Sequence, residues 1–291
     1  MSHLVRLSDL KEYAKLLLSN RVGVIGLALI IPFIFIAVFA PYIAITDPMK
    51  VGTSEEILLP PCPGHPLGTD DMGRDVWSLL VYGSRVSMLV GFLAALIGIG
   101  IGSFVGLVAG YYRGIVEEVI MRLVDIVMVI PTLPLMIVLA AVLGPSLWNV
   151  IIAISVVGWP STARIVRSQV LSVRERPYVE AARCLGAGDL RLMFSEILPN
   201  VVPIIFAETI LWVSEAIYSE AVLSFLGLGD PMHASWGMML HFAFESGVMS
   251  VAWWWVLPPG MCIALVVLGF SLFGSAVNEI LNPRYREFLY Y

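Results

Sequence analysis

The sequence predicts an all-α integral membrane protein with six transmembrane helices. Of the 291 residues, 59% are hydrophobic and only 13% are charged, which is too apolar for one water-soluble domain. The apolar residues also gather in runs of about 20 or more, long enough to cross a hydrocarbon core of about 30 Å as helices. The six runs span residues 22–45, 85–112, 118–143, 147–171, 200–226 and 252–278.

The positions of lysine and arginine predict the orientation of these spans. An even number of spans leaves both termini on one side, and all 17 basic residues except Lys50, Arg74 and Arg85 fall on that side. Because cytoplasmic segments carry an excess of Lys and Arg, both termini are expected in the cytoplasm. The expected segments are a cytoplasmic N-terminal segment (1–21), the first span (22–45), an extracellular or periplasmic loop (46–84), a five-helix core (85–278) that includes a cytoplasmic loop (172–199), and a cytoplasmic tail (279–291).

The first span follows basic residues, as the core of a signal peptide would. It is longer than such a core and no small-x-small cleavage site follows it, so we expect it to remain as a helix. The loop after it contains a group of acidic residues and a histidine: His65, Asp70, Asp71 and Asp75. Their spacing matches no metal-binding loop, so we expect a folded cap and no metal.

The second span carries glycines at every fourth position: Gly98, Gly102, Gly106 and Gly110. This spacing places them on one helix face, where a neighbouring helix can approach closely. Helix packing is the expected role, and a sliding or gating surface is the alternative.

Prolines fall inside the third and fourth spans, namely Pro131, Pro134 and Pro160. Each removes a backbone donor and is expected to kink its helix. Bent helices fit a bundle that encloses a pathway, and they fit irregular packing equally well.

The segment "ERPYVEAARCLGAGDLRLMFSEILPN" (175–200) interrupts the apolar runs with charge at helical spacing. It predicts a short helix from Pro177 that ends at Gly186, and a second helix capped by Asp189 and stopped by Pro199. Neither helix is long enough to be stable alone in water, so both need a surface to pack on. Because the polar face mixes acidic and basic residues, docking of the first helix in a partner's groove is favoured over a hairpin lying on lipid.

In the fifth span, Glu208, Trp212, Glu215 and Ser219 recur on one stripe, with Glu220 off it. A charge facing lipid near the bilayer centre costs roughly 2.5 to 3.5 kcal/mol, so the stripe should face protein or water. Either each glutamate is protonated or paired with a neighbouring helix, or the stripe lines a translocation path.

Several stretches of the chain, including the segment 175–200, resemble a known family. "EAARCLG" followed by "ILPN" resembles the cytoplasmic coupling motif of binding-protein-dependent ABC importer permeases. Further stretches are similar to the C-type subunit of the dipeptide/oligopeptide/nickel permease family: "HPLGTDDMGRDVWSLLVYGSRVSMLVG", "RLVDIVMVIPTLPLMIVLAAVLGPS", "ARIVRSQVLSVRERPYVEAARCLGA", "EAVLSFLGLGDP" and "AWWWVLPPG".

The resemblance implies a type I ABC importer permease fold in a prokaryotic plasma (inner) membrane. It implies that the ATPase-contacting helix includes Glu180, Ala181, Ala182 and Gly186, and that Pro199 ends its companion. It also implies a second permease subunit, two cytoplasmic ATPase subunits and an extracellular solute-binding protein. Short peptides are the substrate it favours, followed by oligosaccharides and nickel complexes. Glu208 and Glu215 depart from the small or apolar residues expected there.

Other function classes fit the sequence less well. The chain has no phosphate-binding G-x-x-x-x-G-K-[ST] motif, so ATP and Mg²⁺ are expected in partner ATPases and no cofactor is expected in this chain. Its four histidines are scattered, which disfavours a membrane enzyme, and no feature indicates a nucleic acid partner. A secondary transporter or channel is the alternative, because Asp125, Glu208, Glu215 and Glu220 are ionisable residues within or near spans.

Overall fold

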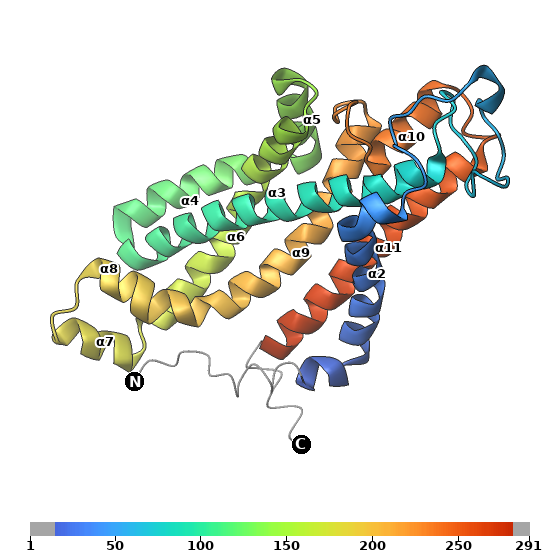
Figure 1. The fold of residues 1–291 in the computed structure, drawn as a ribbon. Coiled ribbons are helices and arrows are strands. Elements are labelled where there is room, and N and C mark those ends of the chain that lie inside the picture. The colour runs from blue at the N-terminus through green and yellow to red at the C-terminus, as the bar shows by residue number, and fades with distance from the viewer. Residues whose placement is uncertain (1–14, 282–291) are drawn as a thin grey trace.

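The computed structural model describes residues 15–281, and this part of the chain is helical without β-strands (Figure 1). Residues 1–14 and 282–291, which include most of the predicted N-terminal segment and tail, lie outside the described residues. The main helices are α2 (Arg21–Ile43), α3 (Val76–Tyr112), α4 (Gly114–Val129), α5 (Thr132–Leu143), α6 (Leu147–Arg174), α7 (Pro177–Cys184), α8 (Asp189–Arg191), α9 (Leu198–Phe225), α10 (Trp236–Glu245) and α11 (Trp253–Leu281).

Within residues 15–281, five helical stretches are long and apolar enough to cross a membrane: α2, α3, α6, the stretch from α8 through α9, and α11. Helices α4 and α5 together provide a sixth, broken span. The predicted all-α membrane fold with six spans is therefore confirmed when this broken pair is taken as one span.

The third predicted span is broken, where the sequence predicted a kink. Helix α4 and helix α5 meet at an angle of 88°. Pro131 disfavours helical geometry at the residue before it, and Ile130 accordingly adopts φ −78° and ψ 128°, an extended conformation. The expected kink at Pro134 was wrong, because Pro134 lies in the first turn of α5, where its missing N–H would have no intrahelical partner. Pro160 lies inside α6, which continues through it.

The second span begins at Val76, although the apolar run predicted residue 85. The carboxylate of Asp75 accepts a hydrogen bond from the Ser78 backbone N–H (2.8 Å) and so caps the helix. The loop between α2 and α3 is correspondingly shorter than predicted.

The fifth span extends through Pro199, so the predicted helix end at this residue was wrong. One helical stretch runs from Asp189 to Phe225, and its residues Leu192–Ile197 are π-helical. The wider π turn changes the hydrogen-bond register just before Pro199, so the proline is accommodated in the first turn of α9. Asp189 was also expected as the cap of this stretch, but Gly188 holds the cap position and Asp189 is the first helical residue.

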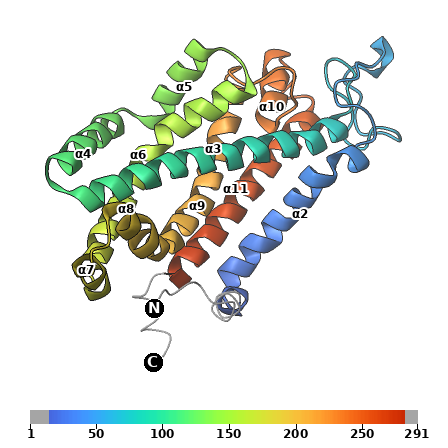
Figure 2. The ribbon, with the colours of Figure 1, turned by 60° about the vertical axis from the view of Figure 1, so that its left-hand side comes forward.

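Helix α3 runs through the middle of the bundle and packs along α6 (Figure 2). Its four regularly spaced glycines face α6: a Cβ atom on Gly102 would lie 2.5 Å from the Trp159 carbonyl oxygen, and one on Gly106 2.5 Å from that of Ala163. Gly98 and Gly110 make the neighbouring close approaches to Ser155 and Val170. The two backbones are therefore as close as glycine allows.

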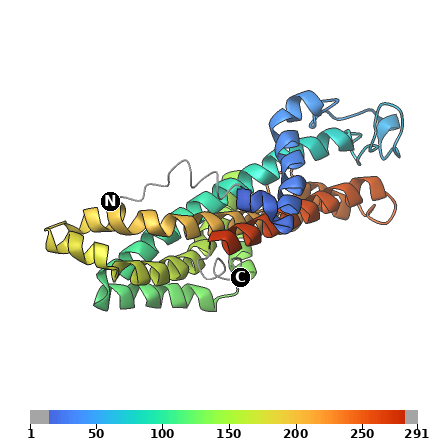
Figure 3. The ribbon, with the colours of Figure 1, turned by 90° about the horizontal axis from the view of Figure 1, so that it is seen from below.

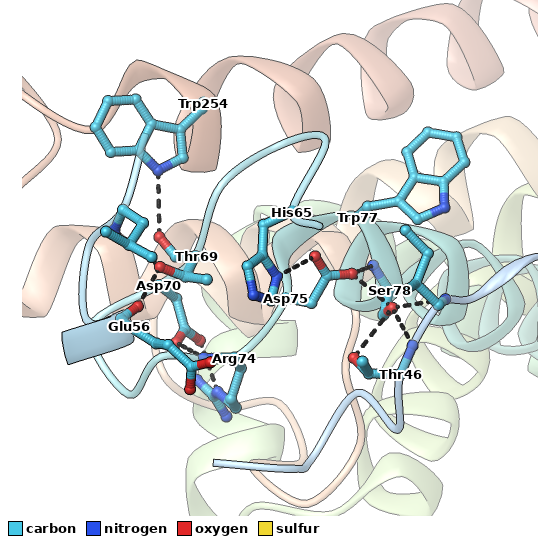
Figure 4. A network of polar contacts seen from close by, with 12 residues as sticks. Thr46, Glu56, His65, Thr69, Asp70, Arg74, Asp75, Trp77, Ser78 and Trp254 are labelled. Atoms are coloured by element: carbon cyan, nitrogen blue, oxygen red, sulfur yellow. Dashed lines mark hydrogen bonds and ion pairs between the residues drawn. The ribbon is translucent and has the colours of Figure 1, made fainter. Parts of the chain in front are cut away.

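A polar network closes the end of the bundle at the loop between α2 and α3 (Figure 4). Asp70 pairs with Arg74 (2.6 Å), and Asp75 binds both His65 (2.9 Å) and Ser78. Trp254 of α11 donates to the carbonyl oxygen of Thr69 (3.2 Å), which attaches the loop to the bundle. Asp70 and Asp75 thus belong to separate structural pairs that hold a folded cap.

Asp71 stands apart from these pairs in the same cap. Burial raises the pKa of the Asp71 carboxyl, and the neighbouring charge of Asp70 raises it further.

Candidate coupling and translocation sites

Helix α7 projects from the end of the bundle opposite the cap (Figures 1 and 3). Pro177 supplies its first turn, and Gly186, with φ +86°, ends it in the left-handed region. The N–H groups of Gly186 and Ala187 donate to the carbonyl oxygens of Arg183 (3.0 Å) and Ala182 (3.1 Å). This pair of bonds is a Schellman motif, which fixes the direction in which the chain leaves α7.

The inner face of α7 holds the helix on the bundle. Val179 is fully buried in a cluster with residues of α3, α6 and the π-helical segment, among them Leu107, Val173 and Met193. Ala182 is half-buried on the same side, whereas Glu180, Ala181 and Gly186 are exposed. The motif residues therefore divide, with Ala182 facing the bundle and the other three facing outward.

Large apolar side chains surround the exposed motif residues. Leu185 is 88% exposed and Leu190 is 71% exposed, and Tyr178 and Phe194 are also exposed. Exposed apolar groups gathered at the end of a helical hairpin are typical of a protein-binding surface. We refer to Tyr178, Glu180, Ala181, Leu185 and Leu190 as the hairpin surface.

Sequence comparison decides the family of the chain. The model of the family described as "Binding-protein-dependent transport system inner membrane component" matches residues 98–287. The chain belongs to this family. A second model, the "N-terminal TM domain of oligopeptide transport permease C", matches residues 9–61. The chain is thus a transport permease subunit, a component of a larger ABC importer complex in the membrane.

Similar permeases match along nearly the whole chain. The dipeptide transport system permease protein DppC of Haemophilus influenzae is 39% identical over 287 residues, covering 96% of each chain. The di/tripeptide transport system permease protein DppC of Pseudomonas aeruginosa is 38% identical and covers 98% of this chain and 95% of its own length. The oligopeptide transport system permease protein OppC of Bacillus subtilis is 36% identical and covers 92% of this chain and 88% of its own length.

A solved permease shares the fold. The inward-facing MetNI methionine ABC transporter aligns with 70% of this chain and 96% of its own, with a TM-score of 0.56 and 18% identity. The permease fold is therefore that of a type I ABC importer.

The stripe predicted on the fifth span divides among three environments in the permease. Glu208 is half-buried, Glu215 is exposed and Ser219 is buried. Trp212 packs on α6, where a Cβ atom on Gly158 would lie 1.9 Å from the indole ring. Glu215 thus lies at the surface of this subunit, Glu208 and Trp212 are partly covered, and Ser219 contributes to the interior.

Glu220, which the sequence placed off the stripe, is the most deeply buried acid of α9, with 2% exposure. Its two carboxyl oxygens accept hydrogen bonds from Ser87 of α3 (2.9 Å) and Ser224 of α9 (2.7 Å). Ser224 lies one helical turn away in the sequence, but Ser87 is a contact that only the fold creates. Glu220 therefore ties α3 to α9.

Asp125, another ionisable residue noted in the sequence, is paired across helices. Its carboxylate accepts from Arg164 of α6 (2.6 Å), and Glu117 of the same helix pairs with Arg167. These ion pairs attach α4 to α6, so both acids have a structural role in the subunit.

Proposed function

We propose that this permease subunit forms half of the translocation pathway of an ATP-driven importer of short peptides. The observation that carries the proposal is the near-full-length identity of 39% to a relative named for dipeptides. The oligopeptide-permease N-terminal model adds independent support from the first span. Oligosaccharides and nickel complexes remain the second and third substrate classes to test.

The hairpin surface is the proposed docking site for a cytoplasmic ATPase. Glu180, Ala181 and Gly186 are exposed around a small helix face, as helix-in-groove recognition requires, and Leu185 offers an apolar anchor. Ala182 supports the docking helix from the bundle side. Pro199 lies exposed in the first turn of α9, and we propose no direct contact with the ATPase for it.

The proposed complex contains a second permease subunit, two ATPases that hold ATP and Mg²⁺, and an extracellular solute-binding protein. ATP hydrolysis takes place in the ATPases, and no cofactor is assigned to this chain. The hairpin end carries four arginines (Arg174, Arg176, Arg183 and Arg191), against Lys50 and Arg74 in the cap, and this bias of Lys and Arg supports placing the hairpin end, and both termini, in the cytoplasm of a prokaryotic cell. The cap between α2 and α3 then faces outward.

Competition for uptake tests the substrate class. The complete importer, reconstituted with its binding protein, is expected to take up a labelled dipeptide in a saturable manner that unlabelled di- and tripeptides inhibit. An oligosaccharide or a nickel chelate at the same concentration should leave this uptake unchanged. Saturable sugar uptake without peptide competition would instead assign the importer to oligosaccharides.

We also propose that Glu208 and Glu215 line the pathway between the two permease subunits. Glu215 is exposed on this subunit, and exposure of a charge to lipid would cost roughly 2.5 to 3.5 kcal/mol near the bilayer centre. Contact with water in a pathway removes this cost. The two carboxylates lie about 10 Å apart along the helix axis, a spacing suited to a short peptide with a cationic amino terminus.

Thiol labelling tests this placement. A cysteine in place of Glu215 is expected to react with a water-soluble reagent in at least one nucleotide state. The matched control is Ser219→Cys, one turn further along α9, where the side chain is buried and should stay unreactive. The Glu208→Gln, Glu215→Gln double variant should lower peptide uptake by at least about tenfold. This factor corresponds to the loss of one hydrogen bond to a charged group. Normal uptake by this variant with unreactive thiols in every state would leave the glutamates as packing residues.

A further inference from the structure

The hairpin that carries α7 is tied at both ends to the end of α3, at its last turn and at the residue that follows it. At its start, Glu175 accepts a hydrogen bond from Arg113 (2.5 Å). At its end, Asp189 accepts one from the hydroxyl of Tyr111 (2.6 Å). The two anchor residues, Tyr111 in the last turn of α3 and Arg113 just after it, are only two positions apart, so both ends of the hairpin are attached at one place on the bundle.

The two ties differ in strength. The side chains of Arg113 and Glu175 are 41% and 64% exposed, and an ion pair so open to water contributes little. Asp189 is exposed, but the donor Tyr111 is only 5% exposed, so one end of this short, charge-assisted bond is shielded from water. The Tyr111–Asp189 bond is therefore the stronger connection.

Tyr111 also contacts α6. The guanidinium of Arg174, the last residue of α6, lies over the tyrosine ring at 5.7 Å from its centroid. Further along, α3 and α6 are held together through the glycine face that includes Gly106 and Gly110. Tyr111 thus lies where the hairpin meets two long helices that pack closely against each other.

We propose that Tyr111 is a positioning residue that transmits movement of α7 to the α3–α6 pair through its hydrogen bond to Asp189. The inference rests on the proposed docking of α7 on an ATPase. Asp189 opens the helical stretch that continues as α9, which carries Glu208 and Glu215. The same bond therefore keeps the start of this stretch in register with α3 when the hairpin is pulled.

The test uses the complete importer in proteoliposomes and measures the ratio of ATP hydrolysed to peptide imported. Tyr111→Phe removes one hydroxyl and keeps the ring beneath Arg174. This ratio is expected to rise at least about fivefold, while the ATPases still co-purify in normal amount, because a hydrogen bond to a charged group is lost. Tyr112→Phe is the matched control: the adjacent ring is 47% exposed, and its hydroxyl has no hydrogen-bond partner among residues 15–281, so the ratio should not change.

A double-variant comparison separates transmission from simple destabilisation. Asp189→Ala should raise the ratio as Tyr111→Phe does, and combining the two should add nothing further, because both remove the same bond. A wild-type ratio in Tyr111→Phe, or additive effects in the combined variant, would overturn the proposal. If Tyr111→Phe fails to assemble, Asp189→Ala alone supplies the decisive ratio, because alanine removes the acceptor of the same bond, and a wild-type ratio in Asp189→Ala would overturn the proposal equally. If the proposed docking of α7 on the ATPase is itself wrong, the result is different: the ATPases do not bind the wild-type chain at all.

Discussion

A Gly186→Val variant is expected to assemble with its ATPases and hydrolyse ATP while importing little peptide. Gly186 has φ +86°, a conformation that costs an L-residue roughly 1 to 2 kcal/mol and a β-branched one more. A Cβ atom there would meet nothing within 4 Å, so the cost is conformational and the bundle stays folded. The strain is relieved by breaking the Schellman bonds of Gly186 and Ala187, which changes the direction of α7 on the ATPase.

Gly188→Val is the matched control for this variant. Gly188 lies two residues further along the same exposed corner and also has open space around its Cα, but its φ of −71° suits any residue. We expect normal peptide uptake from Gly188→Val and at least about a tenfold loss from Gly186→Val, measured with equal amounts of assembled complex. Equal uptake by the two variants would contradict the role given to the corner of α7.

The second large effect is expected at the contact of α3 with α6. In a Gly106→Val variant the new Cβ would lie 2.5 Å from the Ala163 carbonyl oxygen and 3.0 Å from the Arg167 nitrogen. Both atoms belong to the backbone of α6, so the clash is relieved only by separating the helices. We expect a destabilisation at or above the upper end of the usual range of about 1 to 3 kcal/mol for overpacking, with loss of monodisperse protein.

Gly100→Val is the control on the same helix. A Cβ atom at Gly100 meets nothing within 4 Å, and loss of a glycine from a helix interior is itself favourable. The unfolding midpoint of the detergent-solubilised subunit should therefore fall by several degrees or be lost in Gly106→Val and stay near wild type in Gly100→Val. Similar midpoints in the two variants would show that the glycine face is not the tight contact described above.

The apolar runs predicted the spans because they depend only on local composition, but the ends of the helices depended on specific contacts. Val76 starts α3 because Asp75 caps it, and the less apolar stretch 83–85 further along the helix concealed this start from a hydropathy criterion. Pro199 was expected to stop a helix by a rule that holds for regular α-helices. The π-helical turn before it, which no local pattern announced, makes the rule inapplicable.

The candidate sites likewise combine features set by local sequence with features set by contacts between helices. The short helix from Pro177 and its corner at Gly186 could be predicted because both depend on consecutive residues. The environments of Trp212 and Glu220 could not, because Gly158 and Ser87 reach them from other helices. Tyr111 gave no signal at all in the sequence, since its partner Asp189 lies 78 residues further along.

Uptake of a labelled dipeptide into proteoliposomes tests the central claim most directly. The vesicles contain this subunit, its partner permease, both ATPases and the external binding protein. We predict uptake that requires ATP on the ATPase side, stops when the ATPases are omitted, and persists when ionophores collapse all ion gradients. Dipeptide uptake by this chain alone, driven by an ion gradient and indifferent to ATP, would contradict the account and identify a secondary transporter.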